Sequence, residues 1–278
     1  MPLAGTLLQW FHWALGLSYT VAPADARAAT TVMDDPTEAL HLAADDADLE
    51  GLRRALRRAL SAGIPVDDDD MDYDRTPLGW LCYGASPHDE ARRIACAELL
   101  LAAGANIEAT DCYGDTPLII AVYAPSKDCP RLVQYLLDAG ANPNAIGDGD
   151  CGGYTPLHYA SKEGFVEVAN LLIKHGAAVN AKATCERAGR KTSLQVAIRN
   201  SRHRMYPILL SAGASLPTVT GDDAYLERVV AAGSWANYER LHLDKLTAML
   251  TPMSSPPADI PTEVLRRIVA FAFHVGYY

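Results

Sequence analysis

The sequence predicts an all-α protein: a solenoid of about five helix-turn-helix repeats followed by a degenerate C-terminal unit that caps the stack. Three observations lead to this prediction. A similar start recurs along the chain, apolar residues at helical spacing follow each start, and each apolar run closes on a glycine. Because one such unit cannot bury its apolar face alone, neighbouring repeats are expected to bury one another.

Four of the five repeat starts begin with a hydroxyl residue before a short apolar run. A threonine hydroxyl can cap a helix, and proline at the first helical position has no N–H group to lose. A short first helix should therefore follow each start, with its leucine (Leu78, Leu118, Leu157 or Leu194) pointing into the stack. The starts are Thr76-Pro77-Leu78, Thr116-Pro117-Leu118, Thr155-Pro156-Leu157 and Thr192-Ser193-Leu194, after a degenerate start at residues 38–44.

A glycine closes the second helix that we expect in each repeat. Glycine adopts the left-handed conformation that ends a helix and turns the chain into the next loop. In the fifth repeat Pro207 falls inside the expected second helix, so it should either shorten that helix or lie in its first turn. The closing glycines are Gly63, Gly104, Gly140, Gly176 and Gly213.

The best-formed repeat resembles a known family. Residues 155–160, Thr-Pro-Leu-His-Tyr-Ala, together with Val168, residues 171–172, Gly176-Ala177 and Val179-Asn180, resemble the ankyrin repeat almost position for position. That repeat is about 33 residues long, whereas the starts at residues 38, 76, 116, 155 and 192 are 38, 40, 39 and 37 residues apart. In two repeats we expect the extra residues between the two helices, around Pro87 to Arg93 and around Pro125 to Lys127. In two others we expect them in the loop that leads to the next repeat, at Gly147 to Gly153 and Thr184 to Arg190. The first repeat should instead have a longer second helix.

These patterns divide the chain into five parts. An apolar segment, residues 1–34, precedes the ankyrin repeats, residues 35–215. The repeats span approximately residues 38–75, 76–115, 116–154, 155–191 and 192–215. A degenerate capping repeat at 216–251, a proline-rich linker at 252–258 and an amphipathic helix at 259–278 follow.

The N-terminal segment has two interpretations. Leu3 to Ala24 carries no formal charge, and small residues at Ala24, Ala26 and Ala28 could mark a signal-peptide cleavage point, although no Lys or Arg precedes the apolar run. The alternative is a helix that packs on the first repeat. A membrane span is not expected, because polar residues dilute the run. Six cysteines without a C-x-x-C pair indicate reduced thiols and a cytoplasmic protein, or a secreted one if residues 1–28 are removed.

Charge and motif content argue against nucleic-acid binding and catalysis. The net charge of −10 disfavours contact with phosphate backbones and suits a basic or polar protein partner. A G-x-G-x-x-G match at Gly147, Gly149 and Gly152 contains two aspartates that would repel a pyrophosphate. We find no nucleophile, acid/base pair or metal-ligand spacing, and we expect no enzyme activity, no cofactor and no metal.

The resemblance to ankyrin repeats implies binding through the finger loops and the exposed residues of the first helices. Three tyrosines in this set suit an interface, because tyrosine offers a large contact area with a polar end; the alternative is that they are scattered surface residues. The resemblance also implies that His41 and His158 hydrogen-bond loop backbone. The implied contact residues are Arg75, Tyr83, Asp115, Tyr123, Tyr154, Lys162, Glu163, His175, Lys191, Arg199 and Asn200.

Charge along the fingers is uneven. The first finger contains Asp67, Asp68, Asp69 and Asp70, whereas the fourth contains Lys182, Arg187, Arg190 and Lys191. One hypothesis is that a partner segment of opposite polarity lies along the fingers. The alternative is that the acidic finger is simply a solvated loop.

The C-terminal segment contains a second, partial resemblance. Ile260, Pro261, Val264, Leu265, Ile268 and Phe271 are arranged like the opening helix of an F-box. This resemblance implies an adaptor that presents bound proteins to a cullin-type ubiquitin ligase through a ligase subunit. An amphipathic helix that docks on the capping repeat explains the same residues. The sequence thus predicts a non-catalytic interaction scaffold, with a ubiquitin-ligase adaptor or a secreted ankyrin effector as alternatives.

Overall fold

The computed structural model describes residues 35–70, 72–84, 90–124, 129–147, 153–184, 190–216 and 223–250. Within these ranges the chain is helical, and its extended residues form isolated bridges rather than a sheet. The all-α prediction is therefore confirmed. The apolar segment 1–34, the linker 252–258 and the F-box-like residues Ile260 to Phe271 lie outside the described residues.

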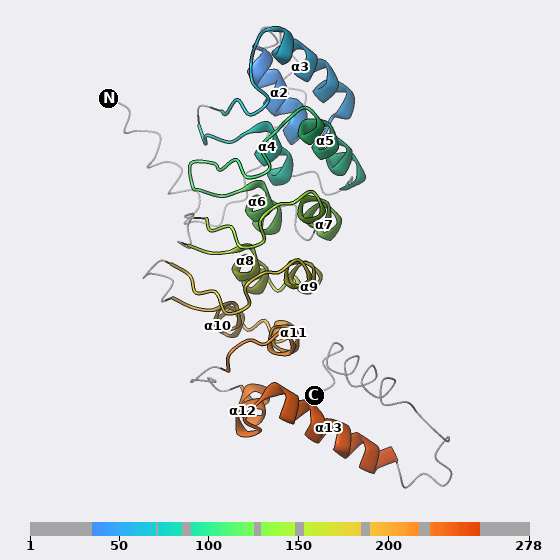
Figure 1. Ribbon diagram of the computed structural model, residues 1–278, viewed down its shortest axis with the longest axis vertical. Coiled ribbons are helices and arrows are strands. Elements are labelled where there is room, and N and C mark those ends of the chain that lie inside the picture. The colour runs from blue at the N-terminus through green and yellow to red at the C-terminus, as the bar shows by residue number, and fades with distance from the viewer. Residues whose placement is uncertain are drawn as a thin grey trace, which may run out of the picture. The chain divides into compact units, whose positions relative to one another are not determined.

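The helices come in consecutive pairs that pack against each other (Figure 1). A loop precedes each first helix, and the second helix returns beside it. The pairs are α2 (Pro36–Asp45) with α3 (Leu49–Ser61), α4 (Pro77–Tyr83) with α5 (Glu90–Ala102), α6 (Pro117–Tyr123) with α7 (Pro130–Asp138), α8 (Pro156–Glu163) with α9 (Val166–Lys174), α10 (Ser193–Arg199) with α11 (Met205–Ser211), and α12 (Ala224–Ala231) with α13 (Trp235–Leu250).

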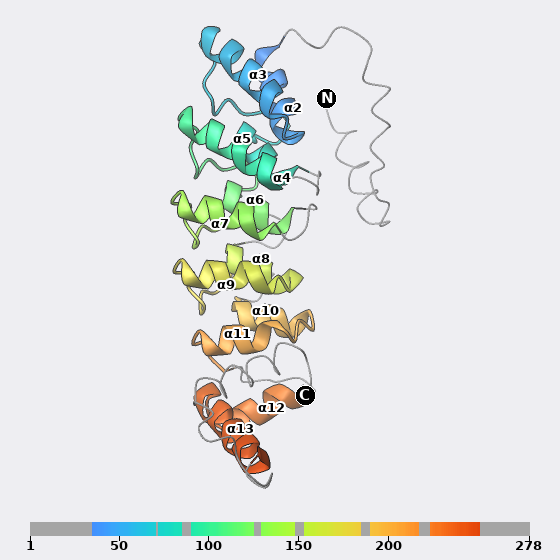
Figure 2. The same ribbon diagram turned by 90° about the vertical axis from the view of Figure 1, so that its right-hand side faces the viewer.

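The repeats are stacked in two columns of helices. The first helices α2, α4, α6, α8 and α10 contact one another in that order, and so do the second helices α3, α5, α7, α9 and α11. Figures 1 and 2 show these columns from two sides, with the finger loops projecting beside the first helices. Buried leucines from both columns form one continuous core, so each repeat is stabilised mainly by its neighbours.

The first helices begin as the sequence predicts. The Oγ1 atoms of Thr76, Thr116 and Thr192 accept hydrogen bonds from the backbone N–H three residues later, at 3.3 to 3.4 Å. The leucine that follows each start is buried. The five closing glycines have φ angles between 77° and 99°, which a side chain would resist.

The region between α4 and α5 differs in part from the expectation. Residues from Glu90 to Arg93 were expected in an inserted loop, but they form the first turn of α5. Arg93 is buried there, and its guanidinium donates hydrogen bonds to the backbone oxygens of Leu81 and Cys82. These oxygens lie at the end of α4, where helix carbonyls lack intrahelical partners, so the insertion supplies a cap for the preceding helix.

A ladder of polar side chains joins successive repeats. Asp67, Glu108, Asn144 and Asn180 occupy equivalent turns after the second helices. Each side chain accepts a hydrogen bond from a backbone N–H of the following repeat: those of Asn106, Asn142, Ala178 and Ser215, at 2.7 to 3.0 Å. The ladder fixes the register between repeats, and each bond contributes roughly 1 kcal/mol.

The helix pair α12 and α13 follows the fifth repeat. Tyr206 of α11, Tyr225 of α12 and Tyr238 of α13 pack ring against ring, with centroids 5.6 to 6.2 Å apart along the series. Pro207 is the third residue of α11, in its first turn, where its missing N–H costs no helical hydrogen bond. None of the helices in the described part of the chain combines the length and hydrophobicity needed to cross a membrane.

Candidate partner-binding surface

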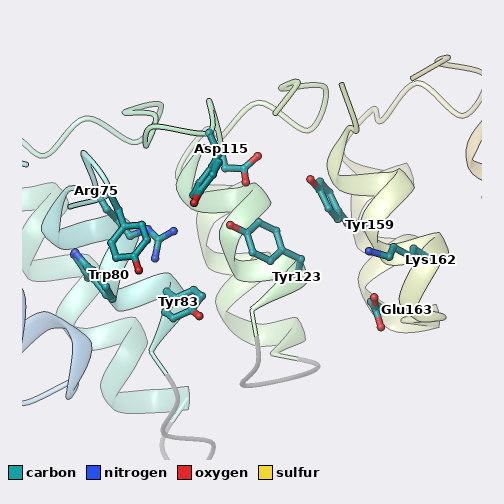
Figure 3. A pocket seen from close by; sticks show the side chains of 10 residues that line it. Arg75, Trp80, Tyr83, Asp115, Tyr123, Tyr159, Lys162 and Glu163 are labelled. Carbon is teal, nitrogen blue, oxygen red and sulfur yellow. The ribbon is translucent and has the colours of Figure 1, made fainter. Parts of the chain in front are cut away.

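A cavity of about 360 Å³ opens on the side of the first helices and fingers. We call it the aromatic pocket (Figure 3). Its walls come from three consecutive repeats: from α4, α6 and α8 and from the loops that precede α4 and α6. The lining residues are Tyr73, Arg75, Trp80, Tyr83, Tyr113, Asp115, Tyr123, Tyr159, Lys162 and Glu163.

Helical spacing brings the aromatic side chains together. Trp80 and Tyr83 are three residues apart on α4, so they share one face, and their ring centroids lie 5.8 Å apart. Tyr123 holds the position in α6 that Tyr83 holds in α4. Its ring centroid lies 5.2 Å from that of Tyr159 on α8, so aromatic contact continues from one repeat to the next.

Arg75 forms the inner wall of the pocket. Its guanidinium carbon lies 4.6 Å from the ring centroid of Tyr83 and 4.9 Å from that of Trp80, and its Nη2 donates to Asp111 Oδ2 at 2.8 Å. Burial acts to lower the pKa of Arg75, but the hydrogen bond to Asp111 and the charges of Tyr123, Asp111 and Tyr83 together outweigh it, so the net pKa is raised. Gly79 leaves room for this side chain, because a Cβ there would lie 2.7 Å from Arg75 Cγ.

Asp111 connects the first two fingers. While Oδ2 binds Arg75, its Oδ1 accepts the backbone N–H groups of Tyr113 and Asp115, each at 3.0 Å. The pKa of Tyr123 is raised above its usual range, mainly because the side chain is buried and secondly because the negative charge of Asp115 lies nearby. Gly147 permits the position of Asp115, because a Cβ on Gly147 would overlap Asp115 Oδ1.

The structure brings together part of the contact set that the sequence suggested. Arg75, Tyr83, Asp115, Tyr123, Lys162 and Glu163 all line the aromatic pocket. The expectation that all of these residues are exposed is wrong, since Arg75 is 4% exposed and Asp115 is 2% exposed. Both residues immediately precede a capping threonine, and at this position the side chain lies between two repeats instead of in solvent.

Five suggested contact residues do not line the pocket. Tyr154 is buried and stacks on His158 at 5.2 Å, so its expected exposure is also wrong. His175 lies against the second helices instead of the first, because its Nε2 is 3.1 Å from Gln134 Nε2 and 3.6 Å from Asp138 Oδ1 on α7. The others are Lys191, which is half-buried, and Arg199 and Asn200, which are exposed at the end of α10.

The two histidines in the Thr-Pro-Leu-His position bind loop backbone, as the resemblance implies. His158 Nδ1 accepts the N–H of Thr155, so Nε2 carries the proton and donates to the carbonyl of Lys191 at 2.9 Å. Burial lowers the pKa of His158. His41 Nε2 likewise lies 2.8 Å from the carbonyl of Asp68. Both histidines therefore hold a finger against a first helix.

Most carboxylates of the acidic finger are used within the fold. Asp67 accepts the N–H of Asn106, Asp68 accepts the hydroxyl of Thr37 at 2.9 Å, and Asp70 accepts the N–H of Arg75 at 2.7 Å. Asp69 is exposed. Structural hydrogen bonding thus accounts for three of the four residues that suggested an acidic docking site.

Sequence reasoning missed several residues of the pocket. Trp80 and Tyr159 lie three residues before Tyr83 and Lys162, so the i, i+3 rule applied to the first helices would have found them. The lining residues Tyr73 and Tyr113, and Asp111 that pairs with Arg75, lie in finger loops, where sequence spacing does not reveal which side chains meet. Their roles appear only when adjacent fingers are placed side by side.

The described cysteines are free thiols. Cys112 is exposed, and Cys82 and Cys96 are buried, where burial raises their pKa values to about 12 and about 11. Cys151 and Cys185 lie outside the described residues. Within the described ranges no three His, Cys, Asp or Glu side chains gather as metal ligands.

Comparisons with known proteins identify the repeats. Residues 85–183 match the family model described as ankyrin repeats in three copies. An Arabidopsis thaliana protein named "Putative E3 ubiquitin-protein ligase XBAT34" is 45% identical over 74 residues, which are 27% of this chain and 19% of that protein. Mouse ankyrin repeat and SOCS box protein 11 is 36% identical over 132 residues, which are 46% of this chain and 37% of that protein.

A longer but weaker similarity covers most of the chain. The Caenorhabditis elegans ankyrin repeat and KH domain-containing protein mask-1 is 27% identical over 217 residues, 74% of this chain and 8% of that protein. The chain thus spans well under half of the length of each of these three relatives. The paired helices, the capped starts, the left-handed glycines and the family match together show that the chain contains ankyrin repeats.

Proposed function

We propose that the chain is a non-catalytic scaffold that binds a partner protein through the aromatic pocket and the adjoining finger loops. The observation that carries the proposal is the pocket itself: a concave site on the first-helix side, lined by aromatic rings from three successive repeats. Ankyrin repeats are protein-interaction modules, and the aromatic lining of this pocket has the composition of an interface centre.

The chemistry of the pocket suits a binding hot spot. Tyrosine and tryptophan are enriched at the energetic centres of interfaces because they bury a large area with few rotatable bonds. Asp115 and Arg75 are held by the fold, so they lose little freedom when a partner arrives. Tyr113, 44% exposed, and the charged residues Lys162 and Glu163 form the polar rim.

A matched pair of substitutions within one repeat tests this proposal. Tyr123 on α6 lines the pocket, whereas Tyr135 on α7 is also half-buried but belongs to the second helix. Tyr123→Leu should weaken capture of the physiological partner by about tenfold or more, because a hot-spot ring contributes about 2 kcal/mol or more. Tyr135→Leu should leave capture unchanged.

The readout is quantitative affinity capture followed by mass spectrometry, with both variants checked for helicity by circular dichroism. The exposed variant Tyr113→Ala provides a second test that leaves the core intact. If every captured protein binds all three variants as well as the parent chain, the pocket is not the partner site and the proposal fails.

A second candidate function is that of a substrate-recruiting adaptor of a cullin-type ubiquitin ligase. Its support is that the name of one relative refers to a ubiquitin ligase, together with the F-box-like residues at the C-terminal end. The test is a pull-down of the ligase adaptor subunit, which Leu265→Asp should abolish without loss of helicity. If the segment only caps the repeats, the same substitution should lower stability instead.

A further inference from the structure

Helix α3 presents a basic surface that is separate from the aromatic pocket. Four arginines lie within six consecutive residues of this helix, and all four are exposed, while the apolar residues between them are buried. The helix is the first in the column of second helices (Figures 1 and 2), whereas the pocket is lined by first helices and fingers. We call this surface the arginine face, and it consists of Arg53, Arg54, Arg57 and Arg58.

The arrangement of these arginines works against the stability of the helix. Residues four apart on a helix are neighbours, so Arg53 lies beside Arg57 and Arg54 beside Arg58, and like charges at this spacing are destabilising. In the described part of the chain the side chains of Arg53 and Arg57 have no ion pair and no hydrogen bond. Arg54 Nε donates to the backbone oxygen of Glu50 at 3.4 Å. A glutamate in place of Arg57 would turn one repulsion into an attraction.

Solubility of the end of the stack does not require this pattern. An end repeat needs a polar outer face, and side chains of mixed charge provide one without repulsion. Positive charge is also not a general property of the second helices. The position of Arg57, six residues before the closing glycine, is occupied in the next three repeats by Glu98, Gln134 and Asn170. An unfavourable local pattern without a structural gain indicates a binding surface.

The surroundings of the arginine face favour a short acidic segment over a long polyanion. The four arginines span about 7.5 Å along the helix axis, at about 1.5 Å per residue. Exposed carboxylates lie around them, on Asp48 and Glu50 at the start of α3 and on Glu98 of the neighbouring helix α5, and the chain has a net charge of −10. A nucleic acid or an anionic bilayer would extend past the arginines and meet this negative charge, whereas a few adjacent carboxylates fit within the face.

We propose that the arginine face docks an acidic segment of a partner protein, which forms ion pairs through two or three adjacent Asp or Glu residues. A guanidinium suits a carboxylate because its planar fork can donate two parallel hydrogen bonds. Leu60, 52% exposed and three residues after Arg57, offers an apolar contact beside the charges. The segment therefore also carries one large apolar residue. This surface is additional to the aromatic pocket, and neither proposal depends on the other.

The test is selection of a random peptide library displayed on phage against the full chain. The double variant Arg53→Gln/Arg57→Gln removes two charges from the arginine face and keeps helix-forming residues. The control variant Arg131→Gln/Lys174→Gln removes two exposed charges from the second helices α7 and α9. Peptides that bind the parent chain and the control, but not the arginine-face variant, are kept and sequenced.

We expect adjacent acidic residues in these peptides, together with a large apolar residue. In a synthetic peptide of the selected sequence, replacement of the acidic residues by their amides should weaken binding about threefold or more, because at least two exposed ion pairs are lost. Binding of the acidic peptide should also fall as salt is raised.

Stability gives a second readout. Arg57→Glu removes a repulsive pair and places a carboxylate four residues after Arg53 and three after Arg54. The variant should therefore unfold at the same urea concentration as the parent chain or at a higher one, while it loses the acidic peptide. A lower urea midpoint would show that Arg57 stabilises the fold, and the inference would be overturned.

Other results also overturn the inference. Peptides that depend on the arginine face but lack acidic residues would do so. A duplex DNA fragment or a phosphatidylserine vesicle that binds through the same arginines more tightly than the peptide would identify a polyanion as the occupant. If no selected peptide distinguishes the arginine-face variant from the control, or if Tyr123→Leu weakens the acidic peptide equally, the arginine face is not the docking site. These results leave the proposed role of the aromatic pocket unaffected.

Discussion

The ion pair between Arg75 and Asp111 should be one of the most sensitive points of the fold. The side chain of Arg75 is 5% exposed and that of Asp111 is 1% exposed. Arg75 Nη2 lies 2.8 Å from Asp111 Oδ2, and this pair joins two consecutive repeats. Asp111→Asn is the informative change. An asparagine Oδ1 can still accept the two finger N–H groups, but its amide group would face the guanidinium in place of Oδ2. The substitution therefore removes the charge of Asp111 and keeps the turn.

The magnitude follows from what remains buried. Removing one member of a buried pair leaves the other charge uncompensated, which costs about 3–5 kcal/mol. Arg75→Met should cost less unfolding free energy than Asp111→Asn, for two reasons. Methionine can fill the space against Trp80 and Tyr83. The carboxylate of Asp111 also keeps its hydrogen bonds from two backbone N–H groups. The double variant contains no buried charge at this site, and replacing a whole buried pair is often close to neutral. It should therefore be more stable than Asp111→Asn alone.

Urea unfolding of the four proteins, followed by both circular dichroism and tryptophan fluorescence, measures these values. Two probes are needed because repeat proteins can unfold in more than one step. The reasoning is refuted if Asp111→Asn costs less than about 1 kcal/mol, or if the double variant is as unstable as the two single costs added together.

Three further predictions concern other parts of the fold. Burial lowers the pKa of His158 below the unfolded value of 6.5, so its stabilising contribution is complete above pH 6.5 and is lost as the pH falls from 6.5 toward the folded pKa. Gln195 occupies the same position in the next repeat, so glutamine is the natural replacement for His158. When the pH is lowered from about 7.5 to about 5.5, the His158→Gln variant should lose less unfolding free energy than the parent chain. Equal losses in the two proteins would contradict this role of His158. Asn144→Ala removes two inter-repeat hydrogen bonds and should cost roughly 1–2 kcal/mol in urea unfolding, whereas Asn170→Ala on the exposed face of α9 should cost little. Gly147→Ala should cost about 1–3 kcal/mol, since the added methyl group displaces Asp115, and unchanged stability would show that the finger adapts freely.

The sequence predicted the repeat architecture because the fold depends on local rules. A threonine cap, a buried leucine and a left-handed glycine each act within a few residues, so their spacing reveals the helix pairs without knowledge of tertiary contacts. Pro207 is another residue whose effect is local. From the sequence it should either shorten the second helix of the fifth repeat or lie in its first turn, and it lies in the first turn of α11.

The pocket was only partly predictable because its contacts join residues from different repeats. Tyr83 and Tyr123 were identified from their position on the first helices, but the burial of Arg75 depends on Asp111, 36 residues further along the chain. The acidic finger was also ambiguous in sequence. Its aspartates have the composition of a docking site, yet Asp67 and Asp70 accept backbone N–H groups, which composition does not reveal.

Site-specific photo-crosslinking tests most directly whether a partner protein occupies the aromatic pocket. A photoreactive phenylalanine is placed at Tyr113 on the pocket rim, and at Asn170 on the exposed face of the second helix α9 as a control. Our account predicts a crosslinked partner from position 113 that is absent from position 170 and is lost with Tyr123→Leu. A partner that crosslinks from position 170 and not from position 113 would place the binding surface on the second helices and contradict the account.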